Sequence, residues 1–575
     1  MKRINTNYLY LLIIFLGACS GQPREEDQAS TPVPEIDVAA AVTPEERKQA
    51  HFRHSPLMKE KKQVLSRLSQ QMHYEAFSPI SPYTYPSQDR ENYAHFENQP
   101  VKRTAEAPVS TFSIDVDTAS FSNVRRMLNQ GRLPLADAVR VEELINYFDY
   151  QYPYPDKLDT PFRVHTEIAP TPWNKKSHLL HVGIKAYQPA MKKMPATNLV
   201  FLVDVSGSMH SADKLPLLKQ SMKLLVNQMR AKDRISMVVY AGSTGIILEP
   251  TAGNQKLKIS HAIEKLSAGG STNGASGIQL AYQMAEQGFI KGGINRILLA
   301  TDGDFNVGVT SFEALINMVE QKRANGVGLS TLGFGSGNLN DRLLEQLSNK
   351  GNGAYYYIDT LREANKVLVE EVRSSLMTVA KDTKIQLEFN PNIVSEYRLI
   401  GYENRALKRE DFNNDKVDAG DVGAGHTVTA LYEITFKGKA GRIEPLRYGL
   451  KMELLQKSVK QGELGFLRLR YKKAGQDKSQ LVEKVIHRKD ILSRLSQAST
   501  DFRFAASVAA FGQILRGGQY TESFTLKDVH ELAANNRGQD RYGYRGEFLG
   551  LVRLAESLSP QLSENQTKQI QGKLN

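Results

Sequence analysis

The 575-residue sequence predicts an α/β protein in which a doubly wound domain, residues 198–376, is inserted into a flanking β-sandwich. Within those limits, short runs that are apolar at every position alternate with longer segments of helical periodicity. Such runs indicate strands buried on both faces of a parallel sheet. Outside the limits, several segments alternate apolar and polar residues, as half-buried antiparallel strands do.

The inserted domain is expected to contain six strands and five helices, taken in order along the chain. The strands are expected over residues 198–204, 234–240, 245–250, 294–303, 327–335 and 354–359. The helices are expected over residues 214–229, 255–266, 277–289, 311–325 and 340–350. Doubly wound sheets bind ligands beyond the carboxyl ends of their strands, so the loops at those ends are the first place to look for a site.

The flanks are expected to form one sandwich from strands on both sides of the insertion. Residues 91–197 read as a strand, two helices and two further strands, and residues 377–490 read as antiparallel strands. Segments at 384–403, 426–436, 445–455 and 464–473 carry the strand pattern after the core. The last region, residues 491–575, is expected to be helical, so helical segments are expected in both flanks.

The amino terminus predicts export and lipidation. A basic start and an apolar run too short to span a membrane have the form of a signal peptide over residues 1–18. Residues 16–19, Leu-Gly-Ala-Cys, resemble a bacterial lipobox, which implies that Cys19 is lipidated after cleavage. Ser20 resembles an outer-membrane sorting signal, whereas the acidic residues 25–27 resemble a surface-export signal. The expected location is the cell envelope, on the periplasmic or outer face of the outer membrane. The alternative to lipidation is a plain signal peptide that happens to contain a cysteine.

Composition limits the chemistry further. Cys19 is the only cysteine, so the chain has no intrachain disulfide and no thiolate metal site elsewhere. Residues 19–90 are rich in proline, glutamine, serine and charged residues, and are expected to be a disordered tether. The net charge of +12 fits acidic envelope partners, or a solvated basic surface with no partner, and nucleic acid is not expected.

Five oxygen-bearing residues point to a divalent cation site. Asp204, Ser206 and Ser208 form D-x-S-x-S directly after a buried strand, Thr272 lies in a glycine-rich loop, and Asp302 follows another strand. Carboxylates and hydroxyls are hard donors that suit Mg²⁺, Mn²⁺ or Ca²⁺. The two carboxylates are the only anionic groups of the set and leave a coordination position vacant, so the site should attract an acidic ligand. In the alternative interpretation the aspartate caps a helix and the serines bond turn backbone.

This set of residues resembles the von Willebrand factor type A (VWA) domain and its metal-ion-dependent adhesion site (MIDAS). In that family the D-x-S-x-S motif, a distant threonine and a distant aspartate complete the coordination sphere, directly or through water. The resemblance implies a Rossmann-like fold, Mg²⁺ as the first choice of cation and a protein partner that offers a carboxylate. Asp304 is expected to be either a second-shell residue of this site or a turn residue. Over residues 91–555 the chain also looks like the bacterial YfbK-type VWA lipoproteins.

An enzyme is not expected. The sequence contains no G-x-S-x-G, H-E-x-x-H or Walker motif, and His530-Glu531 has no second histidine one turn on. No histidine lies in the three ligand motifs, and His210 just outside the first is the nearby candidate base. A metal-dependent envelope hydrolase and a purely structural spacer or assembly factor remain as alternatives.

Two other features need an interpretation. Asp115 and Asp117 could form a second cation site, but a strand's period of two favours placing both on a solvent-exposed face. Trp173, the single tryptophan, is expected to be a packing residue near the base of the sandwich.

Overall fold

The computed structural model describes residues 90–559, apart from 156–159, 191–192, 271–273, 304–311, 372–376, 445, 448–461 and 474. Several sequence predictions lie outside the described residues. These are the signal peptide, Cys19, nearly all of the tether, Thr272, Asp304, most of the strand expected at 445–455, and the chain after residue 559.

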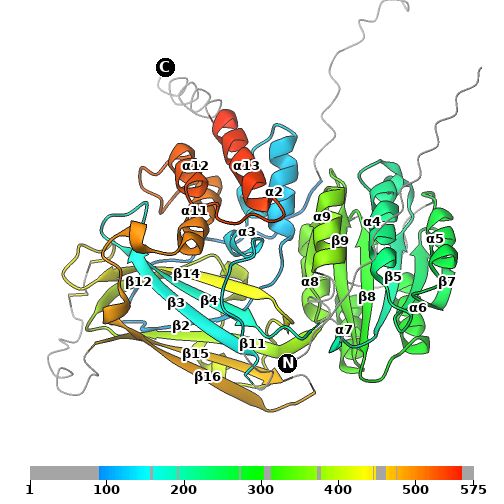
Figure 1. The fold of residues 1–575 in the computed structure, drawn as a ribbon, viewed down its shortest axis with the longest axis horizontal. Helices are drawn as coiled ribbons and strands as arrows, with labels where there is room; N and C mark the ends of the chain where they lie inside the picture. Colours follow the sequence, from blue (N-terminus) through cyan, green and yellow to red (C-terminus); the bar gives the residue numbers. More distant parts are fainter. Residues whose placement is uncertain are drawn as a thin grey trace, which may run out of the picture. The chain divides into compact units, whose positions relative to one another are not determined.

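The inserted domain has a six-stranded sheet, in the order β10-β9-β8-β5-β6-β7 (Figure 1). Its strands are β5 (Thr197–Asp204), β6 (Arg234–Tyr240), β7 (Thr244–Ala252), β8 (Ile294–Thr301), β9 (Val327–Phe334) and β10 (Tyr355–Ile358). All neighbours are parallel except β6 and β7, which are antiparallel. Three residues join that pair, and a connection so short allows only a hairpin. The expectation of a parallel sheet is therefore wrong at this edge strand.

Helices cover both faces of the sheet. They are α4 (Leu215–Gln228), α5 (Lys256–Glu264), α6 (Gly274–Gln287), α7 (Phe312–Ala324), α8 (Asp341–Lys350) and the short α9 (Leu361–Asn365). Alternate residues of β5 point to opposite faces. Phe201 lies in one buried cluster with apolar residues of α4, α5 and α9, and Leu202 lies in another with residues of α6, α7 and α8. This arrangement explains why the strand is apolar throughout.

Strands from both sides of the insertion build the sandwich. One sheet runs β1 (Lys102–Arg103), β12 (Val394–Ile400), β14 (Thr427–Phe436), β4 (His178–Ala186) and β3 (Phe162–Pro170). The other runs β13 (Val422–Gly423), β11 (Thr378–Phe389), β15 (Glu463–Lys473) and β16 (Ser479–His487), with β2 (Val109–Ser113) also paired to β11. The two sheets share one apolar core, in which Phe162 meets Tyr471 with ring centroids 5.2 Å apart. The predicted fold class is confirmed.

Helices from the two ends of the chain pack together beside the sandwich (Figure 1). They are α2 (Ala119–Asn129), α3 (Val141–Asn146), α11 (Thr500–Leu515), α12 (Leu526–Ala534) and α13 (Tyr544–Leu558). The ring of Phe148, just beyond α3, packs with Phe504 of α11 and Phe548 of α13 at centroid distances of 5.0–5.7 Å. Trp173 is buried in the same cluster, so its predicted packing role is confirmed. In the part of the chain that the structure describes, no helix combines the length and apolar character needed to span a membrane.

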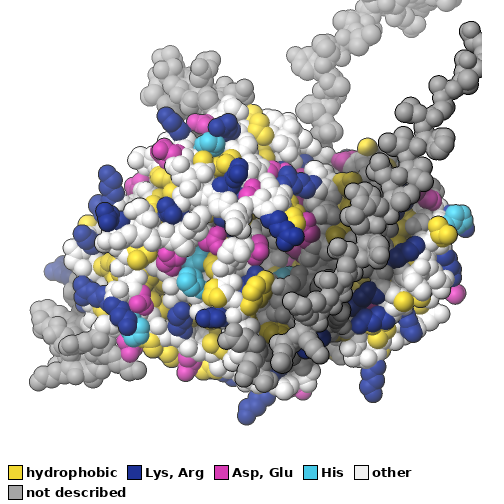
Figure 2. All heavy atoms as spheres, in the orientation of Figure 1, with side chains coloured by type: hydrophobic (Ala, Val, Ile, Leu, Met, Phe, Trp, Pro, Cys, Tyr) yellow, Lys and Arg dark blue, Asp and Glu magenta, His cyan; other side chains and the backbone are white. Residues whose placement is uncertain are grey.

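The basic charge is not gathered in one place on the face drawn in Figure 2. Lys and Arg side chains lie among Asp and Glu side chains there. On this face the excess positive charge therefore gives no sign of a dedicated polyanion surface.

Candidate metal site at the strand ends

The candidate site forms where two adjacent parallel strands end. Asp204 is the last residue of β5, and Asp302 directly follows β8. The two strands pair in register up to Val203 and Ala300, so both carboxylates emerge at the same edge of the sheet. Both side chains are fully buried. The sheet thus joins two aspartates that lie far apart in the sequence.

Hydrogen bonds fix the carboxylate of Asp204. Its Oδ1 accepts the backbone N–H of Ser206 at 2.9 Å, and its Oδ2 accepts the hydroxyls of Thr301 at 2.9 Å and Tyr240 at 3.2 Å. Burial, together with the charge of nearby Asp302, raises the pKa of Asp204 to about 6 against the hydrogen bonds from Ser206 and Thr301. A bound cation would favour the ionised carboxylate. The hydrogen bond between the Ser206 backbone and Asp204 also fits the alternative in which this motif is a hydrogen-bonded turn.

The two serines lie next to each other and to the glycine-rich loop. Their hydroxyl oxygens are 3.0 Å apart, with Ser206 buried and Ser208 exposed in the short 3₁₀ helix η3 (Gly207–His210). The backbone N–H of Gly207 donates to the carbonyl of Gly270 at 3.0 Å. The loop that carries Thr272 therefore reaches the D-x-S-x-S turn two residues before the threonine, which itself lies outside the described residues.

A lysine that the sequence analysis missed also reaches the site. The ammonium Nζ of Lys214 donates to Asp302 Oδ2 at 2.8 Å and to Asn338 Oδ1 at 3.2 Å. Burial raises the pKa of Asp302, but the hydrogen bond and charge of Lys214, with hydrogen bonds from Asn338 and Ser208, lower it overall. Lys214 directly precedes α4, whose amino terminus follows the D-x-S-x-S turn. Its place between the motif and this helix could have pointed to Lys214 in the sequence.

The donors fit a hard divalent cation. Asp204, Ser206, Ser208 and Asp302 offer only oxygen atoms, and the Asp204 carboxylate is already oriented by three donors. This is the ligand chemistry that Mg²⁺ and Ca²⁺ prefer. His210, the candidate base, is exposed at the end of η3. The ammonium of Lys214 would compete with a metal for Asp302.

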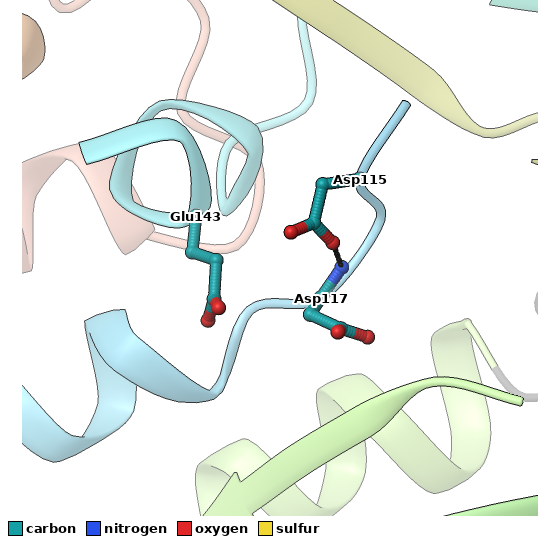
Figure 3. Close-up of side chains that lie close together, drawn as sticks. All are labelled: Asp115, Asp117 and Glu143. Atoms are coloured by element: carbon teal, nitrogen blue, oxygen red, sulfur yellow. Dashed lines mark hydrogen bonds between the residues drawn. The ribbon is translucent and has the colours of Figure 1, made fainter. Parts of the chain in front are cut away.

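A second acidic cluster lies elsewhere in the protein and is paired with arginine side chains. Asp115, Asp117 and Glu143 bring ligand oxygens within 4.8 Å of one another (Figure 3). The predicted solvent-exposed placement of the two aspartates is wrong, because β2 ends at Ser113 and both side chains are buried beyond it.

Every oxygen of this cluster is already engaged. Arg405 donates to Asp115 at 2.8 Å and to Asp117 at 3.0 Å, while Arg140 donates to Glu143. Backbone N–H groups take the remaining three oxygens; they belong to Asp117, Tyr355 and Ser120. The cluster is therefore an arginine-paired junction between the sandwich side and the inserted domain.

Comparison with known proteins gives the same architecture. The von Willebrand factor type A domain family matches residues 198–390, the von Willebrand factor family residues 87–181, and the C-terminal family of uncharacterized protein YfbK residues 374–558. VWA domains typically mediate protein–protein interactions, and many bind a divalent cation.

Individual relatives extend over much of the chain. It is 49% identical over 473 residues to the uncharacterized protein YfbK of Escherichia coli (strain K12), covering 81% of each chain. It is 24% identical over 261 residues to inter-alpha-trypsin inhibitor heavy chain H3 of Homo sapiens, covering 42% of this chain and 28% of that one. A solved von Willebrand factor type A structure from Catenulispora acidiphila aligns at 15% identity with a TM-score of 0.37, covering 68% of this chain and 89% of that one. The chain belongs to the YfbK family of VWA-domain proteins.

Proposed function

We propose that this protein is a non-enzymatic, lipid-anchored component of the cell envelope that binds a protein partner through a divalent cation. The cation, Mg²⁺ in the first instance, would be held by Asp204, Ser206, Ser208 and Asp302, with Thr272 as the fifth residue. The observation that carries the proposal is the convergence of two carboxylates and two hydroxyls at the ends of β5 and β8.

Some residues of the proposed site would bind the cation, and others orient the side chains that bind it. Thr301 and Tyr240 keep the carboxylate of Asp204 in place, which limits the reorganisation required when a ligand binds. Ser208 is exposed, so this side of the site faces solvent and a partner can approach it. When bound, the cation supplies positive charge that attracts a carboxylate of the partner.

The proposed location of the protein is based on its amino-terminal sequence. Lipidation of Cys19 would hold the protein at the outer membrane, on the periplasmic face or the cell surface, and residues 19–90 would give the folded part reach. A single acyl chain binds membranes weakly, whereas several chains on one cysteine give a stable anchor. Mass spectrometry of the mature amino terminus checks this point, because an uncleaved Met1 would contradict it.

The hydrolase alternative has less support from the site. The hydroxyls of Ser206 and Ser208 lie within hydrogen-bond reach of each other, whereas a nucleophilic serine needs a base at that distance. His210 is exposed at the end of η3. Metal-dependent turnover of a phosphoester or peptide that disappears in Ser206→Ala would favour the enzyme instead.

The decisive experiment compares Asp204→Ala with the wild type in metal binding and partner capture. Asp204→Ala should abolish Mg²⁺ or Mn²⁺ binding in calorimetry and should lose the partner in crosslinking, because it removes one of two anionic ligands. Asp213→Ala is the matched control, since Asp213 is an exposed carboxylate that follows the same turn and bonds Ser211 rather than the site. If Asp204→Ala still captures the partner in the presence of chelator, the adhesion mechanism is wrong and a spacer or assembly role gains support.

A further inference from the structure

Lys214 places a positive charge where the proposed site needs its cation. Its Nζ lies 2.8 Å from Oδ2 of Asp302, and the lysine side chain is only 9% exposed. Asp302 itself is fully buried, so solvent screens this pair little. The contact is therefore a buried ion pair inside the candidate metal site and not a surface salt bridge.

The surrounding chain is shaped to receive this lysine. Gly335, directly after β9, has φ of +70°, and a Cβ there would overlap the aliphatic stem of Lys214. The carbonyl of Gly335 accepts the buried hydroxyl of Tyr357, which fixes the loop. Asn338 of the same loop accepts a second hydrogen bond from the ammonium at 3.2 Å. The loop that follows β9 thus holds the lysine against Asp302 at two positions.

We propose that Lys214 is an internal counter-ion of the strand-end site and sets how tightly that site holds a divalent ion. The inference rests on the proposed function. Oδ2 of Asp302 cannot serve a metal fully while it accepts the ammonium, and a cation beside a dication is repelled. A divalent ion must therefore displace the ammonium or share Asp302 with it. Either route weakens binding, so the site fills only where the divalent cation is abundant.

Calorimetric titration of the full-length protein with Mg²⁺ and with Mn²⁺ tests this role. Lys214→Met removes the charge and keeps most of the stem, and Lys214→Gln is the second variant in case the first does not fold. Each should bind the ions about tenfold more tightly than the wild type, or better. Lys223→Met is the matched control, because Lys223 lies on α4 but pairs with the exposed Glu264. It should bind as the wild type does.

Thermal unfolding gives an independent readout. Without divalent ions, Lys214→Met should melt below the wild type, because Asp302 is then buried without its cation. Added Mn²⁺ should raise the melting temperature of the variant more than that of the wild type.

The two possible failures are distinguishable. Equal affinities for the wild type and both Lys214 variants would overturn the role of Lys214 and leave the proposed metal site standing. If none of these proteins binds either ion, the metal site is wrong, and the inference is overturned with it.

Discussion

Replacing Arg405 with methionine is expected to lower the free energy of unfolding by about 3–5 kcal/mol. The guanidinium of Arg405 contacts Asp115 at 2.8 Å and Asp117 at 3.0 Å, and lies 3.7 Å from Glu345. All three carboxylates are at most 8% exposed. Methionine keeps the bulk of the stem but leaves these buried acids without the cation that faces them. Urea denaturation at pH 7 measures the loss.

Two comparisons isolate the charge effect in this prediction. Lys322→Met breaks the exposed pair with Glu286 and should change stability by no more than about 0.5 kcal/mol. Adding Asp115→Asn and Asp117→Asn to Arg405→Met should recover part of the loss, because the unpaired charges disappear with their partner. A loss below about 1 kcal/mol for Arg405→Met would contradict the view that this arginine is the cation of the cluster.

The position of Arg405 gives the prediction structural meaning. Arg405 follows β12 of the sandwich. Two of its partners, Glu345 and Asn349, belong to α8 of the inserted domain. Asp117, from the segment between β2 and α2, also accepts the N–H of Tyr355 in β10. A similar link joins Arg125 of α2 to Asp359, just beyond β10, at 2.5 Å. Charged side chains, together with apolar packing, therefore attach the inserted domain to its neighbours.

The sheet and the positions of the two candidate aspartate ligands could be predicted because they depend on local sequence. The runs that became β5 and β8 are buried on both faces by helices, and burial on both faces leaves an unbroken apolar pattern. A strand's end is equally local, which is why Asp204 and Asp302 could be placed at one edge of the sheet. Edge strand β7 was assigned the wrong direction, since only the length of its connection to β6 determines it.

Contacts between distant segments could not be predicted in the same way. The local sequence suggests that Asp115 and Asp117 face solvent, because their partner Arg405 lies about 290 residues away in sequence. Lys214 looks like an ordinary helix-start lysine, and its role appears only when Asp302 and the loop at Gly335 surround it. In both cases a charge is stabilised in the interior by a partner that no local pattern reveals.

Glu142→Gln is expected to make the protein more stable at alkaline pH. Burial, together with the charges of Glu403 and Asp115, raises the pKa of Glu142 to about 8 against hydrogen bonds from two backbone N–H groups. Among the described residues, Oε2 of Glu142 has no hydrogen-bond partner. Because the folded pKa lies above the unfolded value, the contribution of this group to stability is full below about pH 4.5 and is lost as pH rises through about 8.

Glutamine has the same shape and does not ionise, so the variant escapes that loss. Near pH 5 the two proteins should differ in stability by less than about 1 kcal/mol, and at pH 8.5 the variant should exceed the wild type by about 4 kcal/mol. Urea denaturation from pH 5 to pH 9 follows the difference, with Glu313→Gln at an exposed position of α7 as the control. Its difference from the wild type should not change with pH. A Glu142→Gln curve parallel to that of the wild type would mean that this buried acid is already ionised in the folded protein at neutral pH, with a cation close enough to stabilise it.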